Sequence, residues 1–322
     1  MSQDIAVADL GGTHARFAIA EIAVGRIVSL SNPVTLNTSD YDGFDGAWRA
    51  FGQAIGTDLP AALAIAFAGP VEGDEIKLTN SGWQIRPSSL KERLGIGQIE
   101  IVNDFGAIAH AVAQLGPEDF DHICGPDVPP DEGVFTIVGP GTGLGVAQLL
   151  KADGGYQVVE TEAGHIDFAP LDEVEDRILF DLRGKFGRVS VERLLSGSGL
   201  VNIHDALAAI DDRPPSGLDA KFLWAAALDG SDSLAQASLD RFFLMLGAVA
   251  GDLALAQGAN AVVLAGGLGF RLRDRFSASG FADRFIAKGR FERRMKAIPV
   301  NLITHPQPGL FGAAAAFARK HA

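Results

Sequence analysis

Residues 5–20 read Ile5-Ala6-Val7-Ala8-Asp9-Leu10-Gly11-Gly12-Thr13-His14-Ala15-Arg16-Phe17-Ala18-Ile19-Ala20. The apolar run before Asp9 predicts a short buried strand, and the alternation of Phe17 and Ile19 predicts a second strand. Glycine marks backbone that must turn or approach another group closely, so the Gly11-Gly12 pair predicts the turn of a hairpin. A later glycine turn leads into residues 27–30, which extends the hairpin to an antiparallel meander.

The same pattern returns about half a chain later. An apolar run at residues 134–138 enters Gly139-Pro140-Gly141-Thr142-Gly143-Leu144-Gly145, and residues 146–150 form a further apolar run. Apolar runs at residues 63–67 and 99–102 predict parallel strands that join the first hairpin, so we expect a mixed sheet. Two strand-turn-strand units of one plan predict two lobes, each with a glycine-lined loop that borders a shared cleft.

Length and composition restrict the class of protein. The chain has 322 residues, of which 47% are hydrophobic and 21% are charged, so two lobes are expected and a disordered protein is excluded. No uninterrupted apolar run approaches the roughly eighteen residues that a membrane-spanning helix needs. With 40 acidic and 27 basic residues the net charge is −13, which argues against a nucleic-acid partner. Cys124 is the single cysteine and no basic leader is present, so a disulfide and a multi-cysteine zinc site are excluded and a cytoplasmic location is expected.

Helical spacing of apolar residues appears in three stretches. Residues 105–115 predict one buried helix, and residues 239–253 predict a longer one. Residues 309–320 are rich in alanine and predict a C-terminal helix that packs closely against another element. The stretches rich in proline, glycine and aspartate at 125–130 and 211–217 predict surface loops.

The two glycine turns carry groups that suit a phosphate. Successive backbone N–H groups of small residues point toward an anion, and the hydroxyls of Thr13 and Thr142 add donors. The alternative is that glycine only satisfies tight hairpin geometry. Asp9 favours the ligand interpretation, because a buried carboxylate at a strand end needs a cation, for which Mg²⁺ on a nucleotide is the obvious candidate. Neither turn matches the dinucleotide-binding or P-loop fingerprint.

A third glycine pair follows the apolar run at residues 261–264. Gly266 and Gly267 would let a flat adenine ring lie against bare backbone. Strand-to-helix turns also use glycine for packing alone, so both interpretations stay open.

Two polar residues follow the predicted strand at residues 99–102. In open α/β sheets, ligands bind at the carboxyl ends of strands, where Asn103 and Asp104 stand immediately before a predicted helix. Asp104 is a good residue type for a helix N-cap, which is its only role in the simplest interpretation. In the alternative, Asn103 offers a donor and an acceptor to a polyol, and Asp104 takes the proton from a hydroxyl that attacks phosphorus.

Three further polar residues are candidates for a sugar. Glu162 and His165 stand three positions apart across a glycine, close enough to converge on one small ligand, although a histidine of this kind is more often structural. Glu192 follows Ser190 and, taken alone, is typical of a first-turn carboxylate behind a serine cap. The seven histidines show no metal-ligand spacing, so we expect no metal role for them.

Taken together, these segments resemble the bacterial glucokinase family, part of the superfamily of sugar kinases, heat-shock proteins and actin. The motifs occur in the family's order and span nearly the whole chain. They are Asp9-Leu10-Gly11-Gly12-Thr13, Asn103-Asp104-Phe105, Gly141-Thr142-Gly143-Leu144-Gly145, Glu162-Ala163-Gly164-His165-Ile166-Asp167-Phe168-Ala169-Pro170, Glu192-Arg193-Leu194-Leu195-Ser196-Gly197 and Ala265-Gly266-Gly267.

The resemblance implies an α/β, two-lobed actin-like ATPase (ribonuclease H-like) fold with mixed sheets and an inter-lobe cleft. We expect a small lobe at residues 1–110 plus 302–322 and a large lobe at residues 111–301. The implied activity is that of an ATP:D-glucose 6-phosphotransferase, with glucose and ATP as partners and Mg²⁺ as cofactor. The resemblance also implies a homodimer.

Residue roles follow from the same resemblance, position by position. It implies that Asp104 is the general base on the glucose 6-hydroxyl and that Asp9 orients Mg²⁺. It assigns the other sugar hydroxyls to Asn103, Glu162, His165 and Glu192, the phosphates to Gly11, Gly12, Thr13, Gly141, Thr142 and Gly143, and adenosine to Gly266 and Gly267.

Two departures and several alternatives remain. His14 stands where the family usually has Asn, and the single cysteine excludes the related sugar kinases with a cysteine-rich zinc motif as close kin. A kinase for another hexose, such as mannose or an N-acetyl hexosamine, would use the same residue types. A non-catalytic protein that senses sugar or nucleotide would keep the glycine loops. Polyphosphate stays open as the phosphoryl donor.

Overall fold

The computed structural model describes residues 2–71, 73–78, 82–215 and 217–321. The chain divides into two compact units. Unit 1 comprises Met1–Asp119, Val158–Glu160 and His305–Ala322, and unit 2 comprises Phe120–Gln157 and Thr161–Thr304.

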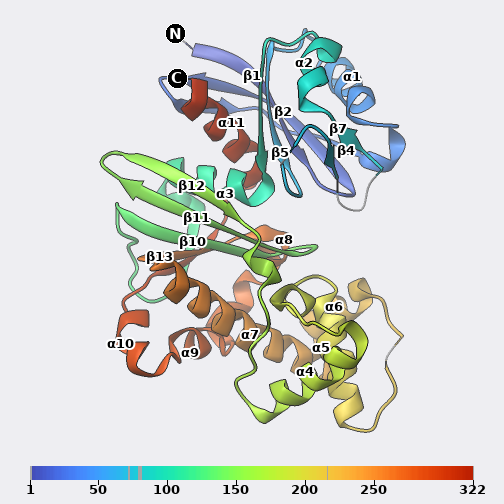
Figure 1. The fold of residues 1–322 in the computed structure, drawn as a ribbon, viewed down its shortest axis with the longest axis vertical. Coiled ribbons are helices and arrows are strands. Elements are labelled where there is room, and N and C mark those ends of the chain that lie inside the picture. Colours follow the sequence, from blue (N-terminus) through green and yellow to red (C-terminus); the bar gives the residue numbers. More distant parts are fainter. Residues whose placement is uncertain (1, 72, 79–81, 216, 322) are drawn as a thin grey trace. The chain divides into compact units, whose positions relative to one another are not determined.

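Unit 1 is built on a mixed sheet of six described strands, in the order β3-β2-β1-β5-β8, with β4 also paired to β2 (Figure 1). β1 and β2 form the predicted hairpin, in which Asp9 faces Arg16. β5 and β8 continue the sheet in parallel, so the mixed sheet is confirmed. The strands are β1 (Ser2–Leu10), β2 (His14–Ala23), β3 (Arg26–Leu30), β4 (Val34–Asn37), β5 (Ala62–Phe67) and β8 (Gln98–Asn103), with β6 (Ile76–Lys77) and β7 (Gln84–Ile85) as a separate pair.

Helices cover both faces of this sheet, which is why β5 is apolar and buried along its whole length. One face carries an aromatic cluster in which the rings of Phe17 and Phe51 stack with centroids 5.2 Å apart. The other face is covered by the predicted C-terminal helix, whose alanines allow close packing on the sheet and on α3. The helices of unit 1 are α1 (Phe44–Ile55), α2 (Pro87–Leu94), α3 (Asp104–Gln114) and α11 (Pro308–His321) (Figure 1).

Unit 2 repeats this plan in its own sheet. The order of its described strands is β12-β11-β10-β13-β14-β9, where β10 and β11 form the predicted antiparallel hairpin and β13 and β14 follow in parallel. The shared order supports the prediction of two units of one plan. The strands are β9 (Phe120–Cys124), β10 (Gly133–Pro140), β11 (Leu144–Ala152), β12 (Gly155–Thr161), β13 (Ala261–Leu264) and β14 (Val300–Ile303).

The core of unit 2 is organised by the long helix α7 (Ser233–Gln257), as the apolar period predicted. Asp232 caps its start by accepting the N–H of Ala235 at 2.8 Å, and Gly258 ends it with a φ of 69°. Within the described part of the chain, no helix is long and apolar enough to cross a membrane. The other helices are α4 (Glu173–Phe186), α5 (Gly199–Ile210), α6 (Ala220–Asp229), α8 (Gly266–Arg271), α9 (Phe281–Ile286) and α10 (Glu292–Met295).

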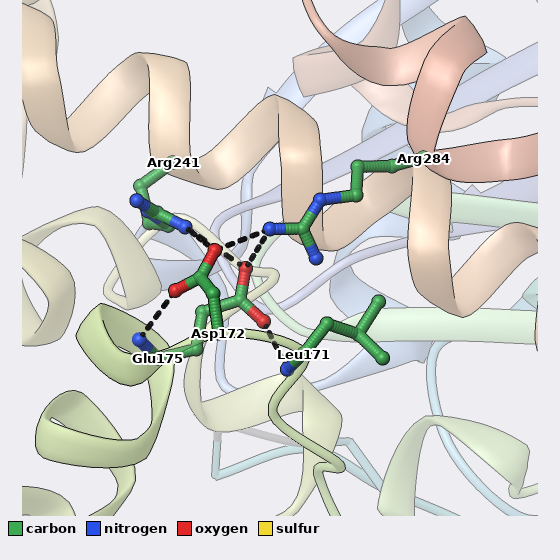
Figure 2. Close-up of polar contacts among 5 residues, drawn as sticks. All are labelled: Leu171, Asp172, Glu175, Arg241 and Arg284. Atoms are coloured by element: carbon green, nitrogen blue, oxygen red, sulfur yellow. Dashed lines mark hydrogen bonds and ion pairs between the residues drawn. The ribbon is translucent and has the colours of Figure 1, made fainter. Parts of the chain in front are cut away.

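A buried ionic cluster joins three of these helices (Figure 2). Glu175, which is fully buried in α4, lies 3.2 Å from Arg241 of α7 and 3.2 Å from Arg284 of α9. Asp172, the N-cap of α4, contacts both guanidinium groups, and Leu171 donates its N–H to Glu175 at 2.8 Å. Burial alone would raise the pKa of Asp172, but the N–H of Glu175 and the side chain of Arg241 together lower it. The two positive and two negative charges compensate each other, as buried charges must.

Candidate active site

The glycine turn of unit 1 links β1 to β2 and is held from outside by Thr38. The N–H of Gly11 donates to the carbonyl of His14 at 3.0 Å, which closes the hairpin. The hydroxyl of Thr38 donates to the carbonyl of Gly12 at 2.9 Å, and its N–H donates to the carbonyl of Thr13 at 3.0 Å. Gly12 and Thr13 border a hollow of about 410 Å³ within unit 1. The turn is therefore fixed through its carbonyl groups while its small residues face open space.

Asp9 lies beside this turn, and its partner in the structure is Arg16. Nη1 of Arg16 is 3.3 Å from Oδ2 of Asp9, because the two residues face each other across the hairpin. Burial raises the pKa of Asp9 above its ordinary value, and the charge of Arg16 offsets part of that rise. Burial by itself therefore does not require magnesium at Asp9, since the chain supplies a positive charge.

A magnesium ion at Asp9 would depend on ligands from outside the protein. Among the described residues, no three or more His, Cys, Asp or Glu side chains gather in a way that could hold a metal. Mg²⁺ in nucleotide enzymes is commonly held by one or two carboxylates together with substrate phosphates and water. A single carboxylate next to a glycine turn fits that pattern.

Asn103 and Asp104 follow each other at the carboxyl end of β8, and Asn103 is the N-cap of α3. Its Oδ1 accepts the N–H of Phe105 at 2.9 Å and that of Gly106 at 3.2 Å, while Nδ2 donates to the carbonyl of Gly69 at 3.1 Å. The prediction that Asp104 is the N-cap is wrong by one residue. Asp104 is the first residue of the helix, and its Oδ1 also accepts the N–H of Phe105, at 2.9 Å. The helix dipole stabilises a negative charge at this position.

Glu160 of β12 is a residue that sequence reasoning missed. Its Oε1 accepts the N–H of Asn103 at 2.9 Å. The carboxylate also lies against α3 at Gly106, where a Cβ would come 2.3 Å from the same oxygen. A glycine in the first turn of a predicted helix was the available signal, because helices disfavour glycine unless another group approaches closely. Glu160 thus fixes the backbone that carries Asp104.

The glycine loop of unit 2 joins β10 to β11 and is closed by backbone hydrogen bonds. The N–H of Gly141 donates to the carbonyl of Gly143 at 2.8 Å, and the N–H of Gly197 donates to the carbonyl of Gly141 at 2.8 Å. The buried Trp224 donates from Nε1 to the carbonyl of Gly197 at 2.8 Å. Thr142, at the tip, is exposed. The loop is a well-supported turn whose tip is accessible to a ligand.

Glu162 and His165 are brought together, as predicted. His165 ends the short helix η3 (Ala163–His165), and its Nε2 lies 4.0 Å from Oε2 of Glu162, with both side chains exposed. Arg188, which sequence reasoning missed, supports this segment: its Nη2 donates to the carbonyl of His165 at 2.5 Å and its Nε is 2.6 Å from Oδ1 of Asp167. The exposed pair is therefore held in place through its backbone.

Glu192 lies in the short helix η4 (Val191–Arg193), and its carboxylate contacts the glycine loop of unit 2. Oε2 accepts the N–H of Leu144 at 3.0 Å. A Cβ at Gly143 would lie 2.3 Å from that oxygen, so the glycine leaves the room that the carboxylate occupies. The simpler interpretation holds for the positions, since Ser190 is the N-cap of η4 and Glu192 lies in its first turn, although the Ser190 side chain makes no capping bond with any described residue. The bond to Leu144 gives Glu192 a contact beyond that role.

Gly266 and Gly267 begin α8 directly after β13. Gly266 has a φ of +85°, and a Cβ there would lie 2.7 Å from the carbonyl oxygen of Pro140, so backbone conformation and packing both require this glycine. A Cβ at Gly267 would meet no described atom within 4 Å. Packing therefore accounts for Gly266, whereas Gly267 stays available to a ligand. Because Pro140 precedes Gly141, the two glycine sites of unit 2 are neighbours.

Solved structures identify the class of protein that this fold defines. The crystal structure of a glucokinase from an Antarctic psychrotroph matches with a TM-score of 0.85 and 32% identity, covering 98% of this chain and 98% of that chain. The predicted α/β two-lobed fold with mixed sheets is thereby confirmed. The class is that of the actin-like sugar kinases.

Known sequences then identify the family. The family model described as Glucokinase matches residues 6–320. The chain is 57% identical over 319 residues to the glucokinase of Zymomonas mobilis subsp. mobilis, covering 99% of this chain and 98% of the relative. It is 42% identical over 318 residues to the glucokinase of Paramagnetospirillum magneticum, covering 98% of this chain and 97% of that relative. The chain belongs to the glucokinase family, as the resemblance predicted.

Proposed function

We propose that this protein transfers the γ-phosphoryl group of ATP to the 6-hydroxyl of glucose, giving glucose 6-phosphate and ADP. The observation that carries the proposal is a hydrogen bond to Leu144. This residue ends the glycine loop of unit 2, which is expected to bind the phosphates. Glu192, expected at the sugar, accepts the N–H of Leu144 at 3.0 Å. Membership in a family whose relatives are named glucokinase supports glucose and ATP as the substrates.

Asp104 is the general base in this proposal. The 6-oxygen of glucose attacks the γ-phosphorus, a new O–P bond forms, and the bond from phosphorus to the β–γ bridging oxygen breaks with its electron pair leaving on ADP. The proton of the 6-hydroxyl passes to the carboxylate of Asp104. The Asn103 cap and the bond from Asn103 to Glu160 hold the surrounding backbone, which supports a carboxylate oriented in advance of the reaction.

The phosphates are assigned to the two glycine turns. Unit 1 offers Gly11, Gly12 and Thr13, and unit 2 offers Gly141, Thr142 and Gly143, with backbone N–H groups and threonine hydroxyls as donors. Bound Mg²⁺ supplies positive charge to the phosphate oxygens, and Asp9 is the residue that would hold it. Arg16 favours the ionised form of Asp9 that this role needs. Adenosine is assigned to Gly266 and Gly267. Gly266 sets the course of the backbone, and Gly267 is the residue open to the ligand.

The remaining glucose hydroxyls are assigned to Glu162, His165, Glu192 and Asn103. In unit 2, Glu162 and Glu192 accept hydrogen bonds from the sugar, and Nε2 of His165 lies 4.0 Å from Oε2 of Glu162. In unit 1, Nδ2 of Asn103 carries a second hydrogen besides the one donated to Gly69, and we assign that hydrogen to the sugar. A homodimer is also proposed, which sedimentation would detect as a species of twice the 33.8 kDa chain mass.

The test of this function is an assay of the purified protein with ATP, Mg²⁺ and a panel of glucose, mannose and N-acetylglucosamine. We expect ADP release to be fastest with glucose and the product to carry phosphate on the 6-oxygen, as ³¹P NMR would show. Faster release with mannose or the N-acetyl sugar would assign the protein to another hexose. Sugar binding without ADP release would favour a sensing role, and equal rates with polyphosphate would remove ATP as the specific donor.

A further inference from the structure

The peptide groups of Leu144, where the glycine loop of unit 2 ends and β11 begins, are held by both segments that we assign to the sugar. The N–H of Leu144 donates to Oε2 of Glu192 at 3.0 Å. On the other side, the backbone of Gly164, between Glu162 and His165, approaches so closely that a Cβ there would lie 2.0 Å from the carbonyl oxygen of Leu144. The exit of the loop is thus enclosed by sugar-site backbone and by one sugar-site side chain.

The two ends of this loop are supported in different ways. At the entrance, Gly141 is held by backbone bonds from Gly197 and to Gly143, and a Cβ at Gly141 would meet no described atom within 4 Å. At the exit, the support is the carboxylate of Glu192, which occupies the space beside Gly143 that a Cβ would need. Neither Gly141 nor Gly143 has a positive φ among the described residues, so alanine is compatible with both backbones.

We propose that Glu192 is a positioning residue that couples the glucose site to the phosphate-binding loop, because one carboxylate serves both. This inference rests on the proposed function, in which Glu192 also accepts a glucose hydroxyl. Oε2 stays on the N–H of Leu144 and thereby fixes the carboxylate, while Oε1 is presented to the sugar. A displacement of Gly143 or Leu144 moves the sugar acceptor, and removal of the carboxylate releases the exit of the loop.

The coupling has two directions, because binding linkage is reciprocal. A carboxylate fixed by a backbone N–H is oriented before glucose arrives, so less rotational freedom is lost on binding. When glucose occupies Oε1, the carboxylate is held more firmly and so is the N–H of Leu144. Glucose therefore orders the loop that receives the phosphates, and a change in the loop alters glucose affinity at a distance from the nucleotide.

The first test substitutes alanine at Gly143 and, as a control, at a glycine outside the site, and measures glucose binding by calorimetry without nucleotide. Gly143→Ala places a methyl group 2.3 Å from Oε2 of Glu192, and we expect glucose affinity to fall roughly 10- to 100-fold, the loss typical of one hydrogen bond to a charged group. Gly184→Ala, at an exposed position of α4 where a Cβ would meet no described atom within 4 Å, is the control and should bind glucose within about twofold of the unaltered protein. Equal affinities of the two variants would overturn the coupling.

The second test asks whether the effect passes through Glu192. In the Glu192→Ala protein the carboxylate is gone, so adding Gly143→Ala should weaken glucose binding by less than about twofold further. If Gly143→Ala lowered glucose affinity as much in the Glu192→Ala protein as in the unaltered protein, the methyl group would act through another residue. That result would overturn the coupling. Melting temperatures of all variants, with the exposed helical Gly184→Ala as reference, establish that the comparison is made between folded proteins.

The third test uses the nucleotide side and a conservative variant. Glu192→Gln keeps an oxygen that can accept the N–H of Leu144, so its KM for ATP should stay near that of the unaltered protein, whereas Glu192→Ala should raise it several-fold. Equal KM values for ATP in both variants would contradict the coupling. These results distinguish a failure of the coupling from a failure of the proposed function. Normal glucose affinity in Glu192→Ala would show that Glu192 does not bind the sugar at all. Weak glucose affinity in Glu192→Ala together with normal glucose affinity in Gly143→Ala would rule out only the coupling.

Discussion

Oδ1 of Asn103 accepts the N–H of Phe105 at 2.9 Å, so the helix that carries Asp104 is capped by the residue before it. Oδ1 of Asp104 accepts the same N–H, also at 2.9 Å. With Asn103 in that position, the carboxylate of Asp104 lies within the first turn of the helix, at the edge of the sheet where ligands bind. This arrangement supports the proposal that Asp104 is the base.

The cap predicts a graded effect on stability. Asn103→Ala removes the acceptor for two N–H groups and should lower the free energy of unfolding by about 1–2 kcal/mol. Asn103→Ser retains an oxygen that can cap, so it should lose less. Denaturant unfolding of the three proteins measures this order, and an alanine variant as stable as the serine variant would show that the cap contributes nothing.

The contact between α3 and α11 depends on Gly312. A Cβ there would lie 1.8 Å from the carbonyl oxygen of Ala107, and a backbone atom cannot move aside as a side chain can. We expect Gly312→Ala to destabilise the protein by about 1–3 kcal/mol or more. Gly184→Ala, in an exposed helical position where a Cβ meets no described atom within 4 Å, should instead stabilise it by about 0.5–1 kcal/mol. Equal thermal denaturation midpoints for the two variants would contradict this account.

His110 predicts a loss of stability in mild acid. Burial in α3, with a smaller effect from the positive charge of Arg319, lowers the pKa of His110 from its ordinary value near 6.5 to about 4. The folded protein thus binds fewer protons at His110 than the unfolded chain does. The contribution of neutral His110 to the free energy of unfolding is therefore complete above about pH 6.5 and declines as the pH falls toward 4. At pH 5 the decline amounts to about 2 kcal/mol.

Denaturant unfolding at pH 7.5 and pH 5 measures this contribution. His110→Gln has no group that titrates in this range, so its stability should fall by about 2 kcal/mol less than that of the unaltered protein between the two pH values. An identical fall in both proteins would mean that His110 is charged in the folded state.

Glu162 and His165 predict a separation of sugar affinity from nucleotide affinity. Glu162→Gln and His165→Ala should raise the KM for glucose by roughly 10-fold or more and change the KM for ATP little, because both side chains are assigned to hydroxyl groups. Arg273→Ala, on an exposed residue of unit 2 outside the site, is the control. Calorimetry that finds ATP affinity more affected than glucose affinity would reverse the assignment.

Much of the fold is predictable because its determinants are local. Apolar runs predicted the central strands of both sheets, and the period of 3.6 predicted α3 and α7. β4, β9, β12 and β14 were not predicted. β4, β9 and β12 are partly exposed strands without a long apolar run, and β14 is a buried strand of only four residues that contains Asn301. β9 contains Asp121 and His122 next to each other, a pair that no propensity scale favours for a strand.

The types of the candidate site residues are visible in the sequence, but most of their partners are not. Arg16 is an exception, because counting outward from the turn of the hairpin places it opposite Asp9. Glu160 and Arg188 reach their partners only through tertiary packing, so spacing along the chain carries no trace of those bonds. The cap was misplaced by one residue because Asn and Asp are almost equally good at that position.

The central claim is that the carboxylate of Asp104 removes the proton from the attacking sugar hydroxyl. Asp104→Asn preserves size and polarity but cannot accept that proton, so kcat with glucose, ATP and Mg²⁺ should fall by roughly 10²- to 10⁴-fold. Glucose binding, measured by calorimetry on the same protein, should remain within about threefold of normal, since the asparagine still forms hydrogen bonds. A variant that binds glucose normally and turns over at close to the normal rate would contradict the account.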